Sequence, residues 1–210
     1  MKKLNIRLTF TRDILGTICN DPEVHKKYLQ AEARKDADEA TLKKLEAELA
    51  ALPAEDSLKL AVTRFYRDPQ GRPALADYQV KGFIKEALET LLGIDGAGDH
   101  KIGKRKLSPF TCRGLVDALV FVTPRWMPLA DSDKPLQTLT RPLRAMTPQG
   151  PRVALATSEL IPEGTAVSFT ITILSDDMTK WVTDALEYGA MRGLGQWRNA
   201  GYGSFTVEVE

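Results

Sequence analysis

Cysteine and histidine are scarce in this sequence, with two of each among 210 residues. Cys19 and Cys112 lie 93 positions apart, and neither a C-x-x-C pair nor a histidine cluster accompanies them. Zinc sites draw on closely spaced Cys and His ligands, so we expect no zinc centre. We also expect no structural disulfide, because two distant cysteines are more typical of free, partly buried thiols.

Long apolar runs are absent too. No segment approaches the roughly 18 apolar residues that a membrane-spanning helix needs. Arg7, Thr9 and Arg12 interrupt the amino-terminal segment, which therefore lacks the apolar core of a secretory signal peptide. We expect a cytoplasmic protein that does not contact a membrane. The composition, 43% hydrophobic and 27% charged, is that of a folded chain with one substantial domain over residues 1–210.

The net charge is only +1, but this value arises from cancellation between segments. Residues 61–152 hold fifteen basic and nine acidic side chains, whereas residues 153–210 hold three basic and eight acidic ones. Clustered charge of one sign can build a local anion-binding face on a neutral protein. The alternative is a solvated surface with scattered charges. The basic clusters of the central segment are Arg64, Arg67 and Arg72; Lys101, Lys104, Arg105 and Lys106; and Arg141, Arg144 and Arg152.

Hydrophobic periodicity divides much of the chain into expected strands and helices. Strict alternation over residues 4–10 predicts a half-buried strand. A 3–4 spacing of apolar residues predicts a helix over residues 78–92 that ends at Gly93. Residues 115–122 are almost continuously apolar, which predicts a strand in the centre of a sheet. The other expected elements are strands over residues 58–66, 166–174 and 204–209 and a helix over residues 179–191.

Three segments interrupt this series. Residues 22–52 are rich in Ala, Glu, Lys and Leu, and predict an inserted helical hairpin that can contact a partner. Residues 94–109 predict a mobile basic loop, and residues 131–156 an extended, arginine-rich insertion. Without these segments and the strand over residues 58–66, the order is strand, helix, strand, strand, helix, strand. This order predicts an α+β, ferredoxin-like fold, in which an antiparallel sheet carries helices on one face.

Four glycines lie between the last expected helix and the last strand, in a G-x-G-x5-G-x-G pattern. The phosphate-binding glycines of dinucleotide and P-loop folds follow a strand and open a helix, so both of those sites are excluded. Glycines permit positive φ and exposed main-chain amides, and the interleaved aromatic and guanidinium groups supply stacking faces for an anionic ligand. The alternative is a tight structural loop with its tryptophan in the core. The expected ligand-binding residues here are Gly193, Gly195, Gln196, Trp197, Arg198, Asn199, Gly201, Tyr202 and Gly203.

The cluster Arg141, Arg144 and Arg152 is a second candidate for anion binding. Prolines at 142 and 151 fix the backbone beside these arginines. A rigid backbone with planar guanidinium forks suits a phosphate clamp. The alternative is a β-hairpin whose arginines pair with the acidic residues of the inserted hairpin.

The glycine pattern resembles the glycine-rich loop of the RAMP superfamily, the ferredoxin-fold proteins of CRISPR systems. Residues 77–85 are similar to the helix-opening element of that superfamily, where small residues precede Lys-Gly; here these are Lys81-Gly82, and Tyr78-Gln79 replaces the usual Pro-Gly-Ser-Ser. The whole chain also resembles uncharacterised phage and prophage proteins. The resemblance implies RNA binding with Lys81 as a further contact, no cofactor, a bacterial host cytoplasm and, in some members, metal-independent RNA cleavage.

Recognisable catalytic units are missing from the sequence. It has no Ser/His/Asp arrangement, paired carboxylates or metal-ligand spacing. Cleavage of RNA at a 2′-hydroxyl often uses a histidine as general base or acid, and only His25 and His100 are present. His25 falls in the inserted hairpin, so His100 is the single catalytic candidate. The pattern favours a protein that is not an enzyme.

Three hypotheses follow. The first is a non-catalytic phage-type protein that binds a phosphate-bearing ligand, either a nucleotide-type immune signal or single-stranded RNA or DNA, in counter-defence by sequestration. The second is a metal-independent endoribonuclease that uses His100. The third is a protein-binding or assembly module, a CRISPR-subunit mimic that contacts a host defence protein through residues 22–52. Self-association into a homo-oligomer is compatible with each of them.

Overall fold

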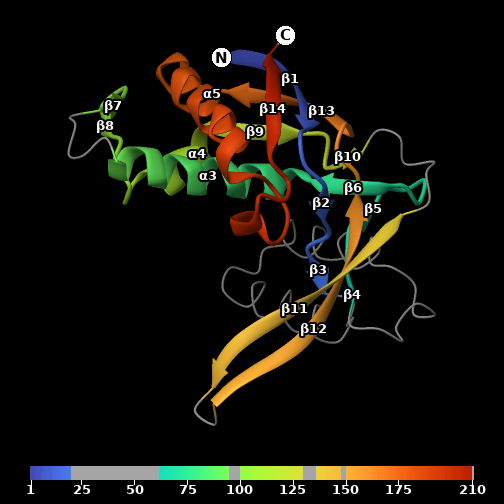
Figure 1. Cartoon of the computed structure of the whole chain (residues 1–210). Coiled ribbons are helices and arrows are strands. Elements are labelled where there is room, and N and C mark those ends of the chain that lie inside the picture. Colours follow the sequence, from blue (N-terminus) through green and yellow to red (C-terminus); the bar gives the residue numbers. More distant parts are fainter. Residues whose placement is uncertain (20–61, 95–99, 130–135, 148–149, 210) are drawn as a thin grey trace, which may run out of the picture.

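Strand β1 (Lys2–Phe10) lies inside a four-stranded antiparallel sheet whose order is β14-β1-β13-β9. The outer members are β14 (Phe205–Val209) and β9 (Val120–Thr123), and β13 (Ala166–Ile173) lies between β1 and β9. The computed structural model describes residues 1–19, 62–94, 100–129, 136–147 and 150–209 (Figure 1). The α+β class with antiparallel sheets that the sequence predicts is confirmed.

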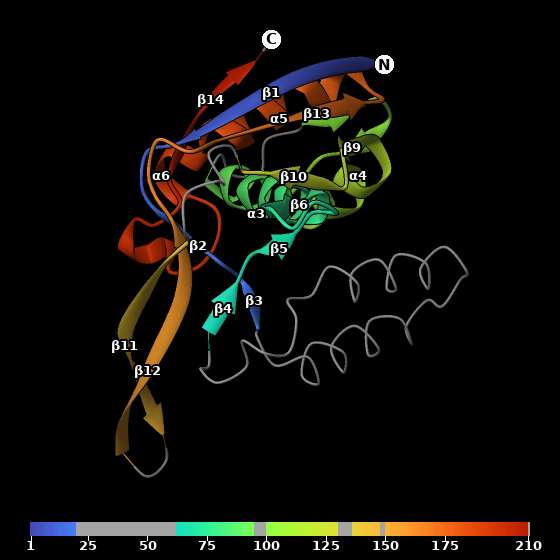
Figure 2. The ribbon, with the colours of Figure 1, turned by 90° about the vertical axis from the view of Figure 1, so that its right-hand side faces the viewer.

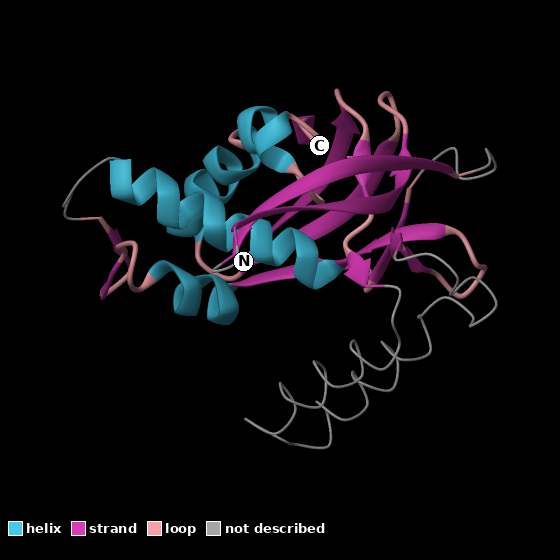
Figure 3. Cartoon of the chain, turned by 60° about the horizontal axis from the view of Figure 1, so that its bottom comes forward, coloured by secondary structure: helices cyan, strands magenta, loops and turns pink. Residues whose placement is uncertain are grey.

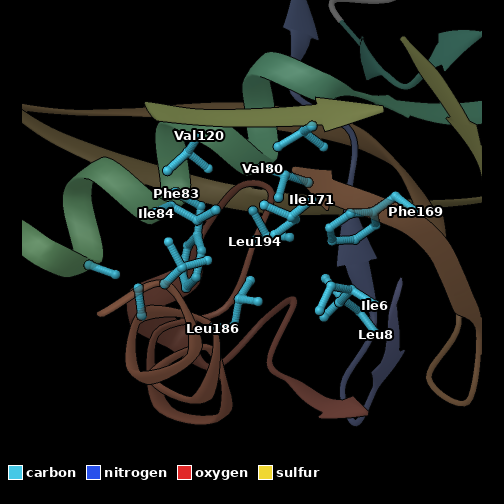
Figure 4. Packing of buried hydrophobic residues seen from close by; sticks show 14 of the residues in the cluster. Ile6, Leu8, Val80, Phe83, Ile84, Val120, Phe169, Ile171, Leu186 and Leu194 are labelled. Carbon is cyan, nitrogen blue, oxygen red and sulfur yellow. The ribbon is translucent and has the colours of Figure 1, made fainter. Parts of the chain in front are cut away.

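Alternation in β1 decides which face of this sheet is buried. Leu4, Ile6, Leu8 and Phe10 are each at most 5% exposed, whereas the residues between them face outward. Successive side chains of a strand point to opposite faces, so these four lie on one face and cover it with apolar surface. Figure 4 shows Ile6 and Leu8 in the core with Phe169 and Ile171 of the neighbouring strand β13 and with buried side chains of the helices.

Helix α3 (Asp77–Ile94) supplies much of the other side of the core. Its buried residues recur at helical spacing, which confirms the helix predicted from the sequence. Helices α5 (Thr179–Glu187) and α6 (Gly189–Arg192) complete this layer and precede the last strand. The helices, cyan in Figure 3, gather on one side of the strands. The buried residues of α3 are Val80, Phe83, Ile84, Ala87, Leu88 and Leu92.

The prediction for residues 115–122 was wrong. Helix α4 (Cys112–Leu119) takes most of this segment, and only its end enters β9, which is an outer strand rather than a central one. Leu115, Val116 and Leu119 follow helical spacing, so a short run of apolar residues satisfies both periodicities. In β9 the burial alternates, with Phe121 44% exposed, as an edge strand allows.

A long hairpin, β11 (Gln137–Thr147) and β12 (Gly150–Ile161), projects away from the four-stranded sheet (Figure 2). Near its base β12 pairs in parallel with β4 (Val62–Arg64), and β4 pairs with β3 (Ile18–Cys19). Strand β2 (Ile14–Leu15) also pairs with β12. Almost all of the described part of the extended 131–156 segment is therefore strand. The hairpin joins the rest of the protein where Thr157 and Ser158 of β12 pair with β4.

The remaining strands form two small sheets. In the first, the order is β10-β6-β5, with β10 (Trp126–Pro128), β6 (Pro73–Ala76) and β5 (Tyr66–Arg67). In the second, β7 (Lys101–Ile102) pairs with β8 (Arg105–Lys106), so a hairpin occurs within the segment 94–109. The helical hairpin predicted over residues 22–52 lies outside the described residues. Within those residues, no helix is long and apolar enough to cross a membrane.

Candidate functional site

The four-glycine turn, residues 193–203, closes tightly on itself between α6 and β14. All four glycines have positive φ, between 72° and 89°. A Cβ at Gly203 would lie 1.7 Å from the carbonyl oxygen of Leu194, and a Cβ at Gly195 would lie 2.7 Å from that of Leu15. Only glycine combines this backbone conformation with such close approach. The spacing that the sequence singled out is thus a requirement of the turn itself.

Most amides of this turn already have acceptors inside the protein. Leu194 N donates to Gly203 O at 2.8 Å, and Gly203 N donates to Asp13 O at 2.8 Å. Gly193, Gln196, Ala200 and Gly201 likewise donate to carbonyls of the chain. These six amides are therefore occupied by acceptors of the protein itself.

Two arginines, Arg192 and Arg198, hydrogen-bond to Glu86 of α3 and so connect the turn to this helix. Arg198 Nη1 donates to Glu86 Oε2 at 2.8 Å, and Arg192 donates through Nε and Nη2 to Glu86 Oε1 at 3.0 and 2.8 Å. Arg192 Nη1 also donates to Asn199 Oδ1 at 2.7 Å. Arg198 and Asn199, which the sequence predicts as ligand contacts, thus help to hold the turn on α3, and Arg198 shares the single carboxylate of Glu86 with Arg192.

Glu86→Gln is expected to reduce the acid sensitivity of the fold. Burial opposes ionisation of Glu86, but the hydrogen bonds from Arg198 and Arg192 outweigh it and lower the pKa of Glu86 below its ordinary value of 4.5. A depressed carboxyl pKa contributes stability that is complete above about pH 5 and is lost as the pH falls through the folded-state pKa. Urea denaturation from pH 6 to pH 2 should therefore give a flatter acid limb for the variant.

Glu89→Gln is the matched control for this prediction. Glu89 lies on the same helix and pairs with Arg113, but both side chains are about half exposed, at 44% and 58%. Exposed ion pairs contribute little to stability. An acid limb that changes equally in both variants would contradict the role assigned to Glu86.

Trp197 is held in an unusual position at the tip of the turn. Among the described residues it is the only non-glycine with positive φ, at 55°. Its ring stacks on Tyr202, with centroids 5.1 Å apart and an interplanar angle of 16°, and it remains 40% exposed. Left-handed backbone at a bulky residue costs energy and is typical of functional positions. The turn thus presents a stacked aromatic pair, and not a buried core tryptophan.

Arg141 lies against this aromatic pair from the base of β11. Its guanidinium carbon lies 5.1 Å from the Trp197 ring centroid, and the residue is only 6% exposed. Nη1 donates to Ser158 Oγ at 2.8 Å and Nη2 to Gln196 Oε1 at 3.0 Å, while the buried Nε has no hydrogen-bond partner. Within the described residues no carboxylate pairs with Arg141. Burial lowers its pKa, but an arginine stays charged, so an uncompensated positive charge lies here.

Neutral hydroxyl and amide groups surround that charge. Thr63 Oγ1 lies 2.7 Å from Ser158 Oγ and 3.2 Å from Gln196 Oε1. These residues come from β4, β12 and the turn, and Thr63 and Ser158 are in register in the parallel pair. Sequence reasoning missed Thr63 and Ser158, because a hydroxyl residue in a strand gives no local signal of what it faces. We call Thr63, Arg141, Ser158, Gln196, Trp197 and Tyr202 the Arg141 cluster.

The other predicted arginine and lysine contacts lie elsewhere. Arg144 pairs in register with Val153, and Arg152 with Ala145, farther along the hairpin, but their side chains fall outside the described part of the structure. Lys81 instead faces α4 and β9: its Nζ donates to Asp117 O at 3.2 Å and lies 5.2 Å from the Phe121 ring centroid. The structure does not bring Lys81 into the Arg141 cluster.

His100, the catalytic candidate, lies beside the β7–β8 hairpin. Its ring centroid is 4.8 Å from that of Trp181 on α5. His100 is not one of the residues of the Arg141 cluster. Within the described residues, no group of three or more His, Cys, Asp or Glu side chains can hold a metal ion.

Other central arginines have acidic partners, which sets Arg141 apart. Arg67 Nη2 lies 2.6 Å from Glu159 Oε1, and Arg72 Nη2 lies 2.7 Å from Asp68 Oδ2. Burial opposes ionisation of Asp68, yet hydrogen bonds from the Arg72 backbone and side chain and the Gln70 backbone lower its pKa. Each of these two arginines thus has a carboxylate partner inside the fold, and Glu159 also lies 4.0 Å from Arg64 Nε.

Comparison with known proteins gives structural likeness but no sequence relative. No family model and no curated protein matches the chain. The chain is similar to a chain of the Type IV-B CRISPR complex, at a TM-score of 0.54 and 10% identity, over 100% of this chain and 90% of that one. It is also similar to a chain of the Type III-B Cmr-beta complex bound to cognate target RNA, at a TM-score of 0.49 and 15% identity, over 99% of this chain and 60% of that one. The likeness to the Type IV-B chain shows that the two chains share a fold.

Proposed function

We propose that this chain is a RAMP-like protein with a ferredoxin-like core. The elements β1, α3, β9, β13, α5 and β14 follow one another in the order strand, helix, strand, strand, helix, strand. Their sheet order, β14-β1-β13-β9, places the first and third strands of this set in the centre. This supports the ferredoxin-like arrangement. The likeness to a Type IV-B CRISPR chain supports the same assignment at the level of the fold.

We propose further that the protein binds the phosphate of a single-stranded nucleic acid at the Arg141 cluster, without catalysis. The observation that carries this proposal is a buried arginine that has no carboxylate partner in the described part of the chain and lies beside a stacked, partly exposed aromatic pair. An unpaired buried charge costs several kcal/mol, and a phosphate that pairs with it recovers much of this energy. Trp197 and Tyr202 supply stacking surface for bases.

A polynucleotide fits this cluster better than a free nucleotide signal does. A di- or triphosphate would bring several negative charges to one site, whereas the cluster offers one guanidinium among neutral groups. One phosphate per nucleotide, followed by a stacked base, matches that arrangement. Sequestration in phage counter-defence is the narrower prediction from sequence. Assembly into a larger complex is the second candidate, favoured by the likeness to a CRISPR-complex chain.

Single-stranded RNA is expected to bind with an affinity that rises with length and falls with salt. Each phosphate neutralised on a single strand contributes a slope of about −0.7 to the dependence of log K on log salt concentration. Fluorescence anisotropy with labelled 3-, 6- and 9-nucleotide oligouridylates, from 50 to 300 mM NaCl, measures both effects. We expect a slope of about −2 for the 9-mer, because a strand of this length also contacts cations outside the cluster.

Labelled ATP, a cyclic dinucleotide and a 9-bp RNA duplex are the controls for ligand class. The duplex hides its bases from the aromatic pair and should bind at least tenfold more weakly than the single strand. Tight, salt-insensitive binding of a nucleotide with no binding of the 9-mer would overturn the proposal in favour of the nucleotide-signal hypothesis.

A further inference from the structure

An open pocket of about 190 Å³ lies beside the four-glycine turn and shares a wall with the Arg141 cluster. The residue common to both is Tyr202, which stacks on Trp197 and also lines the pocket. Since a water molecule occupies about 30 Å³ of liquid, the pocket has the room of about six waters, which suits one flat ring system. The lining residues are Arg12, Asp13, Glu163, Ala200, Gly201 and Tyr202.

Main-chain hydrogen bonds fix the walls of this pocket. Asp13 O accepts from Gly203 N at 2.8 Å, and Asp13 Oδ1 accepts from Glu163 N at 3.0 Å. Thr11 N donates to Ser204 O at 2.8 Å, and Gly164 N donates to Phe10 O at 2.7 Å. The β1–β2 connection, the β12–β13 connection and the turn are thus joined, so the pocket does not have to be built on binding.

The charges of the pocket differ from those of the Arg141 cluster. Two carboxylates and one guanidinium line it, and within the described residues neither Arg12 nor Glu163 has a side-chain hydrogen bond or ion pair. Two carboxylates repel a phosphate, so the pocket does not duplicate the neighbouring anion site. A neutral ring with both donors and acceptors on its edges matches this lining.

Guanine has the matching set of edge groups. Its N1–H and N2–H₂ are adjacent donors that a single carboxylate can accept together, and its O6 and N7 are acceptors for a guanidinium. Uracil, cytosine and adenine each lack the pair of adjacent donors. A base unstacked from a single strand exposes both its Watson–Crick and Hoogsteen edges to such groups.

We propose that this pocket selects guanine, with Glu163 accepting from N1–H and N2–H₂, Arg12 donating to the acceptor edge, and Tyr202 contacting the ring. The proposal rests on the proposed function, since the nucleotide that enters the pocket belongs to the strand whose phosphate pairs with Arg141. Tyr202 belongs to both the Arg141 cluster and the pocket. The phosphate at Arg141 and the guanine in the pocket therefore belong to the same nucleotide or to adjacent nucleotides. The protein is then a single-strand binder with a guanine preference.

The test uses the full chain and 9-nucleotide RNAs of sequence U4-X-U4, with G, inosine, A, C or U at X. Fluorescence anisotropy at 100 mM NaCl should give about tenfold tighter binding for G than for A, C or U. Inosine lacks the 2-amino group and should fall between G and A. This comparison needs no variant, so it does not depend on how a substitution affects folding.

Glu163→Gln should reduce the guanine preference to less than threefold and leave the affinity for U9 unchanged or slightly higher. Glu187→Gln removes the same charge from an exposed position at the end of α5 and should keep the full preference. Equal affinities for all five RNAs, or a preference that survives in Glu163→Gln, would overturn the guanine pocket while leaving the proposed function standing. Absence of binding to every RNA would overturn the proposed function itself.

Discussion

Replacing Arg141 by methionine is expected to weaken the binding of single-stranded RNA by about 10- to 100-fold. A hydrogen bond to a charged group contributes about 1.5–3 kcal/mol, and each 1.4 kcal/mol changes an equilibrium constant tenfold. The guanidinium is 6% exposed and, among the residues that the structure describes, has no carboxylate partner, so we expect its charge to pair with the phosphate. Anisotropy titration of a labelled 9-mer measures the loss.

The same substitution is expected to leave the free energy of unfolding unchanged or to raise it. Removing one partner of a buried ion pair destabilises a protein because the other charge is left unpaired, but Arg141 leaves no such partner. Only the neutral acceptors Ser158 and Gln196 lose a donor, and they remain hydrogen-bonded to Thr63 and to each other. Urea denaturation followed by tryptophan fluorescence gives the free energy of unfolding.

Arg67→Met is the matched control, and it should show the reverse behaviour. Arg67 pairs with Glu159, whose side chain is 10% exposed, so its removal leaves a largely buried carboxylate. We expect a loss of about 2 kcal/mol in stability, less than for a fully buried pair because Arg67 itself is 21% exposed. RNA binding should change less than threefold. If Arg141→Met lowers stability and spares binding, Arg141 is a structural residue and the proposed function fails.

Gly203→Ala is expected to destabilise the fold by about 4 kcal/mol or to prevent folding. The φ of 72° places an L-residue in the left-handed region, which costs about 1–2 kcal/mol. The added Cβ would also lie 1.7 Å from a backbone carbonyl oxygen that is fixed by its neighbours, and overpacking adds typically 1–3 kcal/mol. A loss of this size is a large part of the stability of an ordinary domain. Thermal and urea denaturation measure it.

Gly201→Ala separates the two components of this loss. Gly201 lies in the same turn with a φ of 87°, but nothing lies within 4 Å of the position of its Cβ. Only the conformational component applies, and the expected loss is about 1 kcal/mol. Equal losses at the two positions would show that the turn moves to accommodate the clash, and that its closure does not depend on Gly203.

Local periodicity was sufficient to predict much of the core. The alternation in β1 and the apolar spacing in α3 are both consequences of one buried face, and both predictions are confirmed. At residues 115–122 the same reasoning was wrong, because a run of eight residues with Asp117 as its single polar position does not distinguish a period of 2 from one of 3.6. Tertiary packing then decided between helix and strand.

The site was less accessible from sequence. The glycine spacing coincides with the turn between α6 and β14, and four of the predicted ligand contacts, Arg141, Gln196, Trp197 and Tyr202, lie together there; that they bind a ligand stays a prediction. What separates Arg141 from Arg198 is whether a carboxylate faces it, and Glu86 lies 112 positions away from Arg198. Thr63 and Ser158 are brought to the cluster by a parallel strand pairing. No local pattern records such distant pairings.

In strand β12, a hydroxyl residue faces Arg141 and the carboxylate residue that follows it faces away from Arg141. Ser158 lies on the face that meets Arg141, and Glu159, the next residue, lies on the opposite face with Arg67. Because side chains alternate along a strand, a shift of one residue would exchange the two. A carboxylate would then neutralise the guanidinium, and the anion contact that we propose would be lost although every residue of the cluster was still present in the chain.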